Sequence, residues 1–287
     1  MELPVVVGVD GSEAGLEAVD WAADEAVRQE LPLRLVHASL WEHYEGMSPS
    51  FGDRRPSERV RAENIIAEAV ERAEARQPGL KISSNIIVEG AVTALVEESV
   101  RAYAVVVGHR GRGELTGLLL GSVGLGVAAR ARGPVIVVRG AVENRQDAYH
   151  RVLLGVSGVS AADASVDFAF RAADRRGARV EAVHAWRCPD HESTASFDTA
   201  REHLRRAETT LTDAVRDVAA LYPKVTVDRV PVEGLARKAL LDAAVTADLL
   251  VVGAQRRQGR SLGLQLGLVN HALLHHAACP VAVVPQP

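Results

Sequence analysis

Short apolar runs alternate along the chain with amphipathic stretches. The runs cover residues 5–9, 33–38, 82–88, 104–107 and 135–138, and each is typical of a strand buried on both faces of a parallel sheet. Helical spacing of apolar residues begins after Ser12, a favourable N-cap, and recurs at residues 57–76, 91–101 and 122–132. This alternation predicts an α/β fold whose parallel sheet is covered by helices on both sides.

The whole pattern occurs twice. Gly8 and His37 are matched by Gly155 and His184, each 147 residues further on, and the offset falls to between 144 and 146 later in the chain. Matches that keep their order over the whole length indicate a duplicated globular domain. We therefore predict two tandem, doubly wound, five-stranded parallel-sheet domains at residues 1–141 and 150–287, with a polar linker at residues 140–150.

Composition narrows the class of protein. Of 287 residues, 47% are hydrophobic and 24% charged, which is enough to bury a core, and the net charge of -4 argues against a general nucleic-acid binder. Two cysteines, Cys188 and Cys279, cannot build a disulfide framework. The first residues lack the pattern of a signal peptide, and the longest uncharged run, residues 115–129, is too short for a membrane helix. We expect a cytoplasmic protein with neither a membrane nor a nucleic acid as its partner.

A glycine-rich loop follows the fourth apolar run. Gly108 and Gly111 are followed, after nine residues, by Gly121 and Ser122, which open a helix. Glycines let backbone N–H groups approach an anion, a helix N-terminus attracts it, and Arg110 or Arg112 could neutralise its charge. The loop lacks the Gly-Lys-Ser/Thr of a P-loop, and it follows the fourth strand rather than the first. It is either a phosphate cradle or simply a tight loop.

The pattern G-x2-G-x9-G-S, followed by an apolar helix and P-V-x-V-V, resembles the universal stress protein family, and V-G-V-D-G-S at residues 7–12 resembles that family's first strand and loop. The resemblance covers nearly the whole chain, twice. It implies a tandem member with an adenine nucleotide α-hydrolase-like fold. The function it implies is that of an ATP-binding, stress-response regulator.

The same resemblance implies where a nucleotide would lie. In ATP-binding members the triphosphate lies on the glycine loop and the adenosine lies against the ends of the first two strands. Asp10 would then lie near the ribose or a magnesium ion. The residues implied to contact the nucleotide are Val9, Asp10, His37, Ala38, Gly108, His109, Arg110, Gly111, Gly121, Ser122 and Val123.

The second copy departs from this pattern. Ser157 replaces Asp10, Leu268 replaces Ser122, and Arg256 or Arg257 stands at the position of Gly111. Leucine cannot form a hydrogen bond with phosphate, and a β-carbon restricts the approach of the backbone. We expect nucleotide binding to be confined to the first copy, or to be much weaker in the second, whose role is then structural.

Other polar groups have simpler interpretations. His271, His275 and Cys279 share helical spacing and could bind zinc, but no fourth ligand lies nearby, so histidines that complement a helix dipole are the preferred interpretation. His37 and His184 are expected to pack beside their loops. The acidic pairs Glu68/Glu71 and Glu97/Glu98 are expected to lie on solvated helix faces. The turn-rich segment at residues 41–56 is expected to be either a mobile flap over the nucleotide or a plain loop.

Three functions remain open at this stage. The first is a regulator whose conformation or assembly depends on bound ATP. The second is a low-activity ATPase or nucleotidyl transferase, although no catalytic set, G-x-S-x-G elbow or H-E-x-x-H motif can be assigned. The third is a nucleotide-free scaffold. The terminal strands, residues 135–138 and 281–284, are apolar sheet edges whose pairing would join the halves about a pseudo-two-fold axis, as in universal stress protein dimers, and would permit homo-oligomers.

Overall fold

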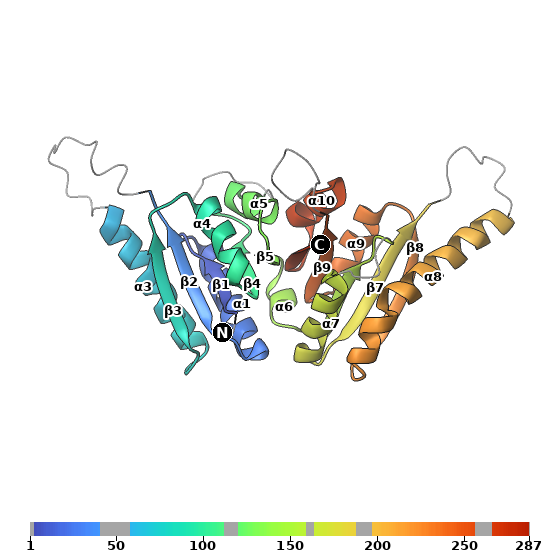
Figure 1. The fold of residues 1–287 in the computed structure, drawn as a ribbon, viewed down its shortest axis with the longest axis horizontal. Helices are drawn as coiled ribbons and strands as arrows, with labels where there is room; N and C mark the ends of the chain where they lie inside the picture. Colours follow the sequence, from blue (N-terminus) through green and yellow to red (C-terminus); the bar gives the residue numbers. More distant parts are fainter. Residues whose placement is uncertain are drawn as a thin grey trace. The chain divides into compact units, whose positions relative to one another are not determined.

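The computed structural model describes residues 3–40, 58–111, 120–158, 164–187, 197–255 and 266–286. The chain forms two compact units, Met1–Val138 and Arg139–Pro287. In each unit, strands alternate with helices along the chain (Figure 1).

The first unit is a five-stranded parallel sheet with helices between its strands. Its strands are β1 (Val5–Gly8), β2 (Leu33–Ala38), β3 (Ile82–Ile87), β4 (Ala104–Gly108) and β5 (Val135–Val138). Its helices are α1 (Glu13–Gln29), α3 (Glu58–Arg76), α4 (Ala91–Glu98) and α5 (Ser122–Ala128), with a 3-10 turn η1 (Ser99–Arg101). The order β3-β2-β1-β4-β5 reverses between β1 and β4, which is where ligands of such sheets bind.

The second unit repeats this topology in the order β8-β7-β6-β9-β10, again with parallel pairing. Its strands are β6 (Arg151–Gly155), β7 (Arg179–Trp186), β8 (Val227–Glu233), β9 (Leu249–Ala254) and β10 (Val281–Pro285). Its helices are α6 (Val142–Arg145), α7 (Ala164–Arg176), α8 (Phe197–Leu221), α9 (Ala236–Ala244) and α10 (Leu268–His276). The predicted fold class is confirmed.

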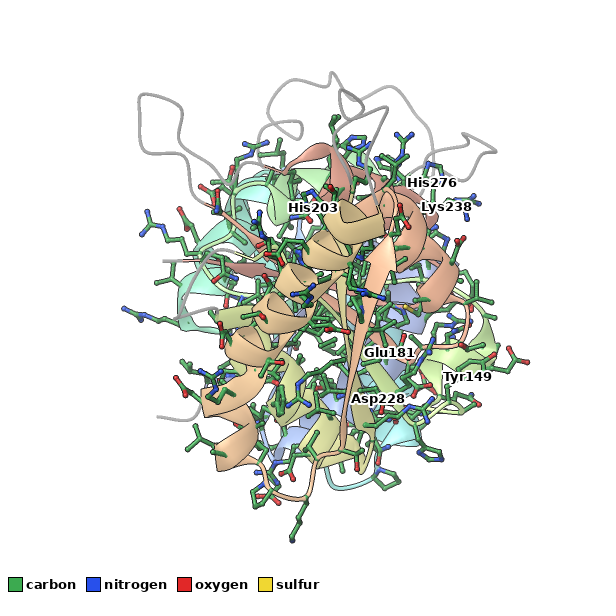
Figure 2. All side chains as sticks on the ribbon, turned by 90° about the vertical axis from the view of Figure 1, so that its right-hand side faces the viewer. Tyr149, Glu181, His203, Asp228, Lys238 and His276 are labelled. Carbon is green, nitrogen blue, oxygen red and sulfur yellow. The ribbon has the colours of Figure 1, made fainter. Side chains whose placement is uncertain are left out.

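Charged pairs line the outer strands of the second unit. Glu181 on β7 and Asp228 on β8 are register partners, and both are labelled in Figure 2. Their like charges are balanced by arginines: Arg151 lies 2.7 Å from Glu181, and Arg179 lies 3.4 Å from Asp228. The Arg151–Glu181 pair between β6 and β7 is largely buried, whereas the Arg179–Asp228 pair between β7 and β8 is half exposed. Because solvent screens an exposed ion pair, the Arg179–Asp228 pair contributes little to holding its strands together.

The centre of the first sheet is made of small and β-branched side chains. Val5, Val6 and Val7 on β1 have no exposed surface, and burial of such a side chain contributes about 1.5–3 kcal/mol relative to exposure. On α1, Ala18 and Ala22 are also fully buried, because alanine lets the helix approach the sheet closely. The apolar runs in the sequence therefore form the core.

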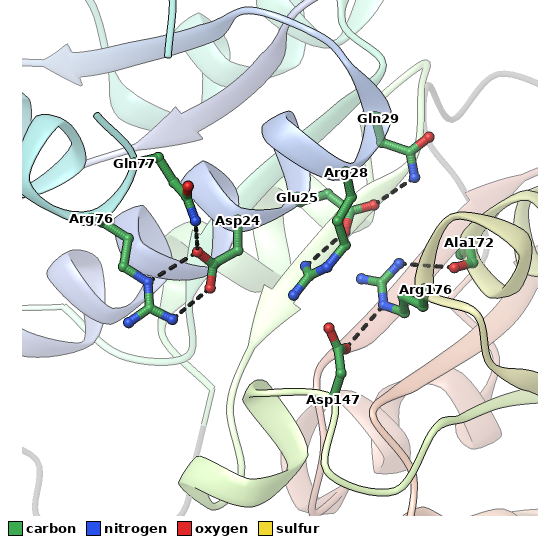
Figure 3. A network of polar contacts seen from close by, with 9 residues as sticks. All are labelled: Asp24, Glu25, Arg28, Gln29, Arg76, Gln77, Asp147, Ala172 and Arg176. Carbon is green, nitrogen blue, oxygen red and sulfur yellow. Dashed lines mark hydrogen bonds and ion pairs between the residues drawn. The ribbon is translucent and has the colours of Figure 1, made fainter. Parts of the chain in front are cut away.

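Ion pairs tie α1 to α3 in the first unit. Arg76 donates two hydrogen bonds to Asp24, at 3.0 and 2.7 Å, and Gln77 donates a third at 2.7 Å (Figure 3). One turn earlier on both helices, Arg72 makes the same bidentate contact with Asp20, at 2.9 and 2.6 Å. These hydrogen bonds raise the pKa of both guanidinium groups, and the two forks fix the register of the helices.

The structure corrects the predicted end of one helix. The pattern extends to residue 132, but α5 ends at Ala128. After it the chain turns against η1, where Arg132 N donates to Ser99 Oγ at 2.9 Å and a Cβ on Gly133 would lie 2.6 Å from Ser99 O. This contact comes from residues more than thirty positions away, and it overrides the local helical pattern.

The segment expected to be a linker belongs to the second unit. Asn144 on α6 donates to Val245 O at 3.1 Å and to Ala247 O at 2.8 Å. Tyr149 N and Arg151 N donate to the two carboxylate oxygens of Asp248, at 2.9 and 2.7 Å. Asp248 is fully buried, and burial raises its pKa. Residues 140–150 are thus held by specific hydrogen bonds.

The repeat extends to the ends of equivalent helices. Glu30, which follows α1, and Gly177, which follows α7, both adopt the left-handed conformation, at φ of 57° and 60°. The next residue in each unit donates back into the last turn, Leu31 N to Ala26 O and Ala178 N to Ala173 O, both at 2.9 Å. The backbone turn is therefore the same, although only the second copy has the residue that adopts it without steric cost.

Candidate functional site

The loop after β1 is organised by Asp10. Its Oδ1 accepts hydrogen bonds from Ser12 N at 3.0 Å and from Ser12 Oγ at 2.6 Å, and Ser12 Oγ in turn accepts from Gly15 N at 3.1 Å. Gly11 adopts a left-handed φ of 74°, which favours glycine. The carboxylate is therefore fixed beside the first turn of α1. Ser12 was predicted only as a helix cap, and the Asp-x-Ser spacing of a local turn is the signal that places its hydroxyl on Asp10.

Gly108, at the end of β4, has a packing reason to be glycine. A Cβ there would lie 2.4 Å from Ala14 O and 3.0 Å from Gly15 N. Backbone atoms cannot retreat as a flexible side chain can, so the first turn of α1 requires a bare Cα at this position. This packing brings the loops after β1 and β4 together.

Gly111 lies against Asp10. A Cβ on Gly111 would lie 2.6 Å from Asp10 Oδ2, and Arg110 O lies 3.5 Å from Ser12 Oγ. Gly121 N donates to His109 O at 2.9 Å, which closes the loop at the start of α5. The structure therefore brings these predicted site residues together at the switch point between β1 and β4: Asp10, Gly108, His109, Arg110, Gly111 and Gly121.

Gly121 differs from the other two glycines. The nearest atom to a Cβ on Gly121, among the described residues, is Gly111 N at 3.7 Å, which is ordinary van der Waals contact. Packing against the described chain therefore does not require glycine at this position. Next to it Ser122 and Val123 are exposed at the start of α5, and Arg110 is exposed on the adjacent loop. The described residues on this side of the loop are therefore exposed.

The histidines at the strand ends hold the neighbouring loops. His37 on β2 is buried and its Nδ1–H donates to Val9 O at 2.7 Å, while Val9 N donates to Val36 O at 2.9 Å. His184 makes the same contact in the second unit, at 2.8 Å from Val156 O. The prediction that both histidines pack beside their loops is confirmed. Ala38, also predicted as a site residue, lies half-buried at the end of β2.

The second unit has a different arrangement at the equivalent strand ends. Ser157, at the position of Asp10, is exposed, and Leu268, at the position of Ser122, has 88% of its surface exposed. Asn270 donates to Gly253 O at 2.9 Å, and the carboxamide of Gln286 lies against the same glycine. Neither amide was predicted to matter, because nothing in the local pattern singles them out.

Within the described ranges, no three His, Cys, Asp or Glu side chains lie close enough together to hold a metal ion. His271 and His275 have ring centroids 4.4 Å apart, and His275 and His276 lie in the last turn of α10. Burial lowers the pKa of His275, with further lowering by the charges of neighbouring His271, His276 and Arg139. Burial raises the pKa of the Cys279 thiol to about 12, which disfavours the thiolate form that binds metals.

Glu98 corrects a further prediction. It is not on a solvated face: its carboxylate accepts two hydrogen bonds from Arg34 on β2, both at 2.9 Å, and the pair is half-buried. Glu68, Glu71 and Glu97 are exposed as predicted. Several predictions fall outside the described residues, namely those on Arg112, Cys188, Arg256, Arg257 and residues 41–56.

Comparison with known proteins shows which family this sequence is similar to. The profile of the Universal stress protein family matches residues 2–139 and again residues 148–285. The chain belongs to the universal stress protein family. The chain is similar along nearly its whole length to a universal stress protein of Mycobacterium tuberculosis strain H37Rv, with 33% identity over an alignment of 303 positions that covers 98% of this chain and 97% of that protein.

A solved structure shares the fold of the whole chain. A universal stress protein from Archaeoglobus fulgidus covers all of this chain and is itself fully covered, with a TM-score of 0.71 at 19% identity. A shorter universal stress protein, solved in complex with cAMP, covers 48% of this chain at 31% identity and a TM-score of 0.36. In the part of this universal stress protein that the structure describes, no helix is both long and apolar enough to cross a membrane.

Proposed function

We propose that the first unit of this universal stress protein binds an adenine nucleotide, with ATP as the ligand, and that occupancy regulates a stress response. The observation that carries the proposal is the contrast between the three glycines of the first unit. Gly108 and Gly111 are explained by close contacts with the chain itself, whereas a Cβ on Gly121 would make only ordinary van der Waals contact with the described residues, beside exposed Ser122. A bare Cα at such a place lets a phosphate reach backbone N–H groups.

The remaining predicted residues fit the rest of a nucleotide. Arg110 is exposed on the same loop and can neutralise phosphate charge, and Ser122 can donate from its hydroxyl. Val9, His37 and Ala38 end the first two strands, where the family resemblance places the adenosine. His109 and Val123 flank the glycines of the loop and complete the proposed site.

Magnesium fits this site only together with a nucleotide. Mg²⁺ is usually held by one or two carboxylates plus substrate phosphates. Asp10 supplies one carboxylate, and its Oδ1 is already engaged by Ser12. If bound, the ion would supply positive charge next to the phosphates, and Asp10 would be the protein group nearest to it.

A regulatory role follows from the rigidity of the parts that would contact the ligand. Ser12 links Asp10 to the first turn of α1 through hydrogen bonds, and Gly111 packs against the same carboxylate. A ligand bound to the glycine loop would therefore be coupled to α1 through Asp10 and Ser12. A ligand shifts a conformational equilibrium only as far as it binds one state better than another.

The experiment that tests the proposal begins with acid denaturation of the purified protein and chromatography of any nucleotide that is released. Equilibrium dialysis with labelled ATP then measures stoichiometry up to millimolar concentration. We expect one equivalent of ATP per chain, without steady turnover. No binding at millimolar ATP would contradict the proposal, and turnover that is abolished by Asp10→Ala would instead identify an ATPase.

A further inference from the structure

Two carboxamides of the second unit surround Gly253 on β9. Asn270, in the first turns of α10, donates from Nδ2 to Gly253 O at 2.9 Å. Gln286, directly after β10, lies so close that a Cβ on Gly253 would be 2.5 Å from its Nε2. Gln286 Oε1 accepts a hydrogen bond from Ala164 N, at the first residue of α7, at 3.1 Å. One side chain thus connects the ends of β9 and β10 with the start of α7.

The first copy of the sequence repeat has glycines at the equivalent places. By the offsets of the repeat, 145 for Gly253 and 146 for the two amides, the counterparts of Gly253, Asn270 and Gln286 are Gly108, Gly124 and Gly140. The geometry supports this alignment, because a Cβ on Gly124 would lie 3.7 Å from Gly108 O, in the direction from which Asn270 reaches Gly253 O. The first copy therefore has no side chain at two positions where the second has an amide.

We propose that Gln286 and Asn270 close the second unit to nucleotide, with the carboxamide of Gln286 acting as an internal ligand. Its oxygen accepts a hydrogen bond from the backbone N–H of Ala164, the type of donor that a phosphate oxygen also uses, and its NH2 group covers Gly253. The inference rests on the nucleotide function proposed for the first unit, and it names the residues that decide which copy takes the ligand.

In this account the second unit lacks nucleotide because the amides of Gln286 and Asn270 occupy the site, and not only because individual ligand-binding groups have been lost. A phosphate that approached Ala164 N would have to displace Gln286, and one that approached Gly253 would meet the carboxamides of Gln286 and Asn270. The ligand gains only the difference between its own hydrogen bonds and those that it replaces. Leu268 is almost fully exposed and blocks nothing by itself, so restoring a hydroxyl there should not restore binding.

The test compares Leu268→Ser alone with the triple variant Leu268→Ser/Asn270→Ala/Gln286→Ala, in the full chain. Labelled ATP is titrated by equilibrium dialysis, and circular dichroism confirms that each variant is folded. We expect wild-type protein and Leu268→Ser to bind one equivalent and the triple variant to bind a second, roughly tenfold or more weaker than the first. Equal stoichiometry in the triple variant and Leu268→Ser, or two equivalents in wild-type protein, would overturn the inference.

A reciprocal pair tests the same idea in the first unit if the triple variant does not fold. Gly124→Asn places a carboxamide within reach of Gly108 O, whereas Gly124→Ala adds only the methyl group that meets the flexible side chain of Leu120 at 3.1 Å. We expect Gly124→Asn to lower ATP affinity roughly tenfold relative to Gly124→Ala. Equal affinities would count against the inference.

These outcomes separate the inference from the function on which it rests. Wild-type protein without ATP binding, next to a triple variant that binds one equivalent, would contradict the function proposed for the first unit and support the internal ligand in the second. One equivalent in both would contradict the internal ligand alone. No binding in either protein would contradict both.

Discussion

Replacement of Asp10 separates its structural role from its role toward a ligand. Asp10 Oδ1 accepts two hydrogen bonds from Ser12, at 3.0 and 2.6 Å, and hydrogen bonds to a charged acceptor contribute about 1.5–3 kcal/mol each. Because Asp10 is half exposed, we take the lower value, so Asp10→Ala should lower the free energy of unfolding by about 3 kcal/mol. Asp10→Asn keeps a neutral acceptor at the same place and should lower it by only about 1 kcal/mol.

The assay is urea unfolding followed by far-UV circular dichroism, with hydrogen exchange of α1 peptides to assign the loss to the first unit. Ser157→Ala is the matched control, because Ser157 is exposed at the equivalent position of the second unit and its loss should change stability by less than about 0.5 kcal/mol. Both Asp10 variants should lose magnesium-dependent ATP affinity. Equal destabilisation by Asn and Ala would refute the argument that hydrogen-bond geometry, rather than charge, holds this loop.

Three further predictions concern stability. Glu30→Gly should stabilise the first unit by about 1 kcal/mol and Gly177→Ala should destabilise the second by a similar amount, since both positions are left-handed; urea unfolding without a change for Glu30→Gly would refute this. Gly108→Ala should cost about 3 kcal/mol or more because its methyl group meets the backbone of α1, whereas Gly253→Ala meets only a side chain and should cost less; a reversed order in thermal melts would contradict the packing argument. Because the pKa of His275 is lowered in the folded state, the stability linked to neutral His275 is present above the ordinary pKa of 6.5 and is lost as pH falls toward the folded-state pKa. The variant His275→Leu should therefore flatten the fall in Tm between about pH 7 and 5. An unchanged dependence of Tm on pH would exclude His275 as the source of that fall.

The repeat in the sequence predicted the fold well because its signals are local. Each buried strand is an uninterrupted apolar run, and the glycines that end β1 and β6 recur at a constant offset. The alternation of strands and helices predicted a doubly wound parallel sheet, and the order β3-β2-β1-β4-β5 comes from the structure.

The sequence-based predictions failed where distant residues decide the structure. The end of α5 depends on Ser99, and the burial of Glu98 on α4 depends on Arg34 on strand β2. The sequence placed the glycines in the loop after the fourth strand, but it did not show why each one is glycine. Gly108 is required by the close approach of α1, whereas no described residue lies close enough to require glycine at position 121. Tertiary contacts of this kind leave no periodic trace in one sequence.

The most direct test of the nucleotide site is the ATP affinity of Gly121→Ala. A methyl group at Gly121 meets no atom of the described chain closer than 3.7 Å, so the fold should be unaffected. The matched control is Gly267→Ala, at the start of α10, where a Cβ has no neighbour within 4 Å among the described residues. We predict that calorimetry will show ATP affinity reduced roughly tenfold or more in Gly121→Ala and unchanged in Gly267→Ala. Undiminished affinity in Gly121→Ala would show that the phosphates do not lie on this loop.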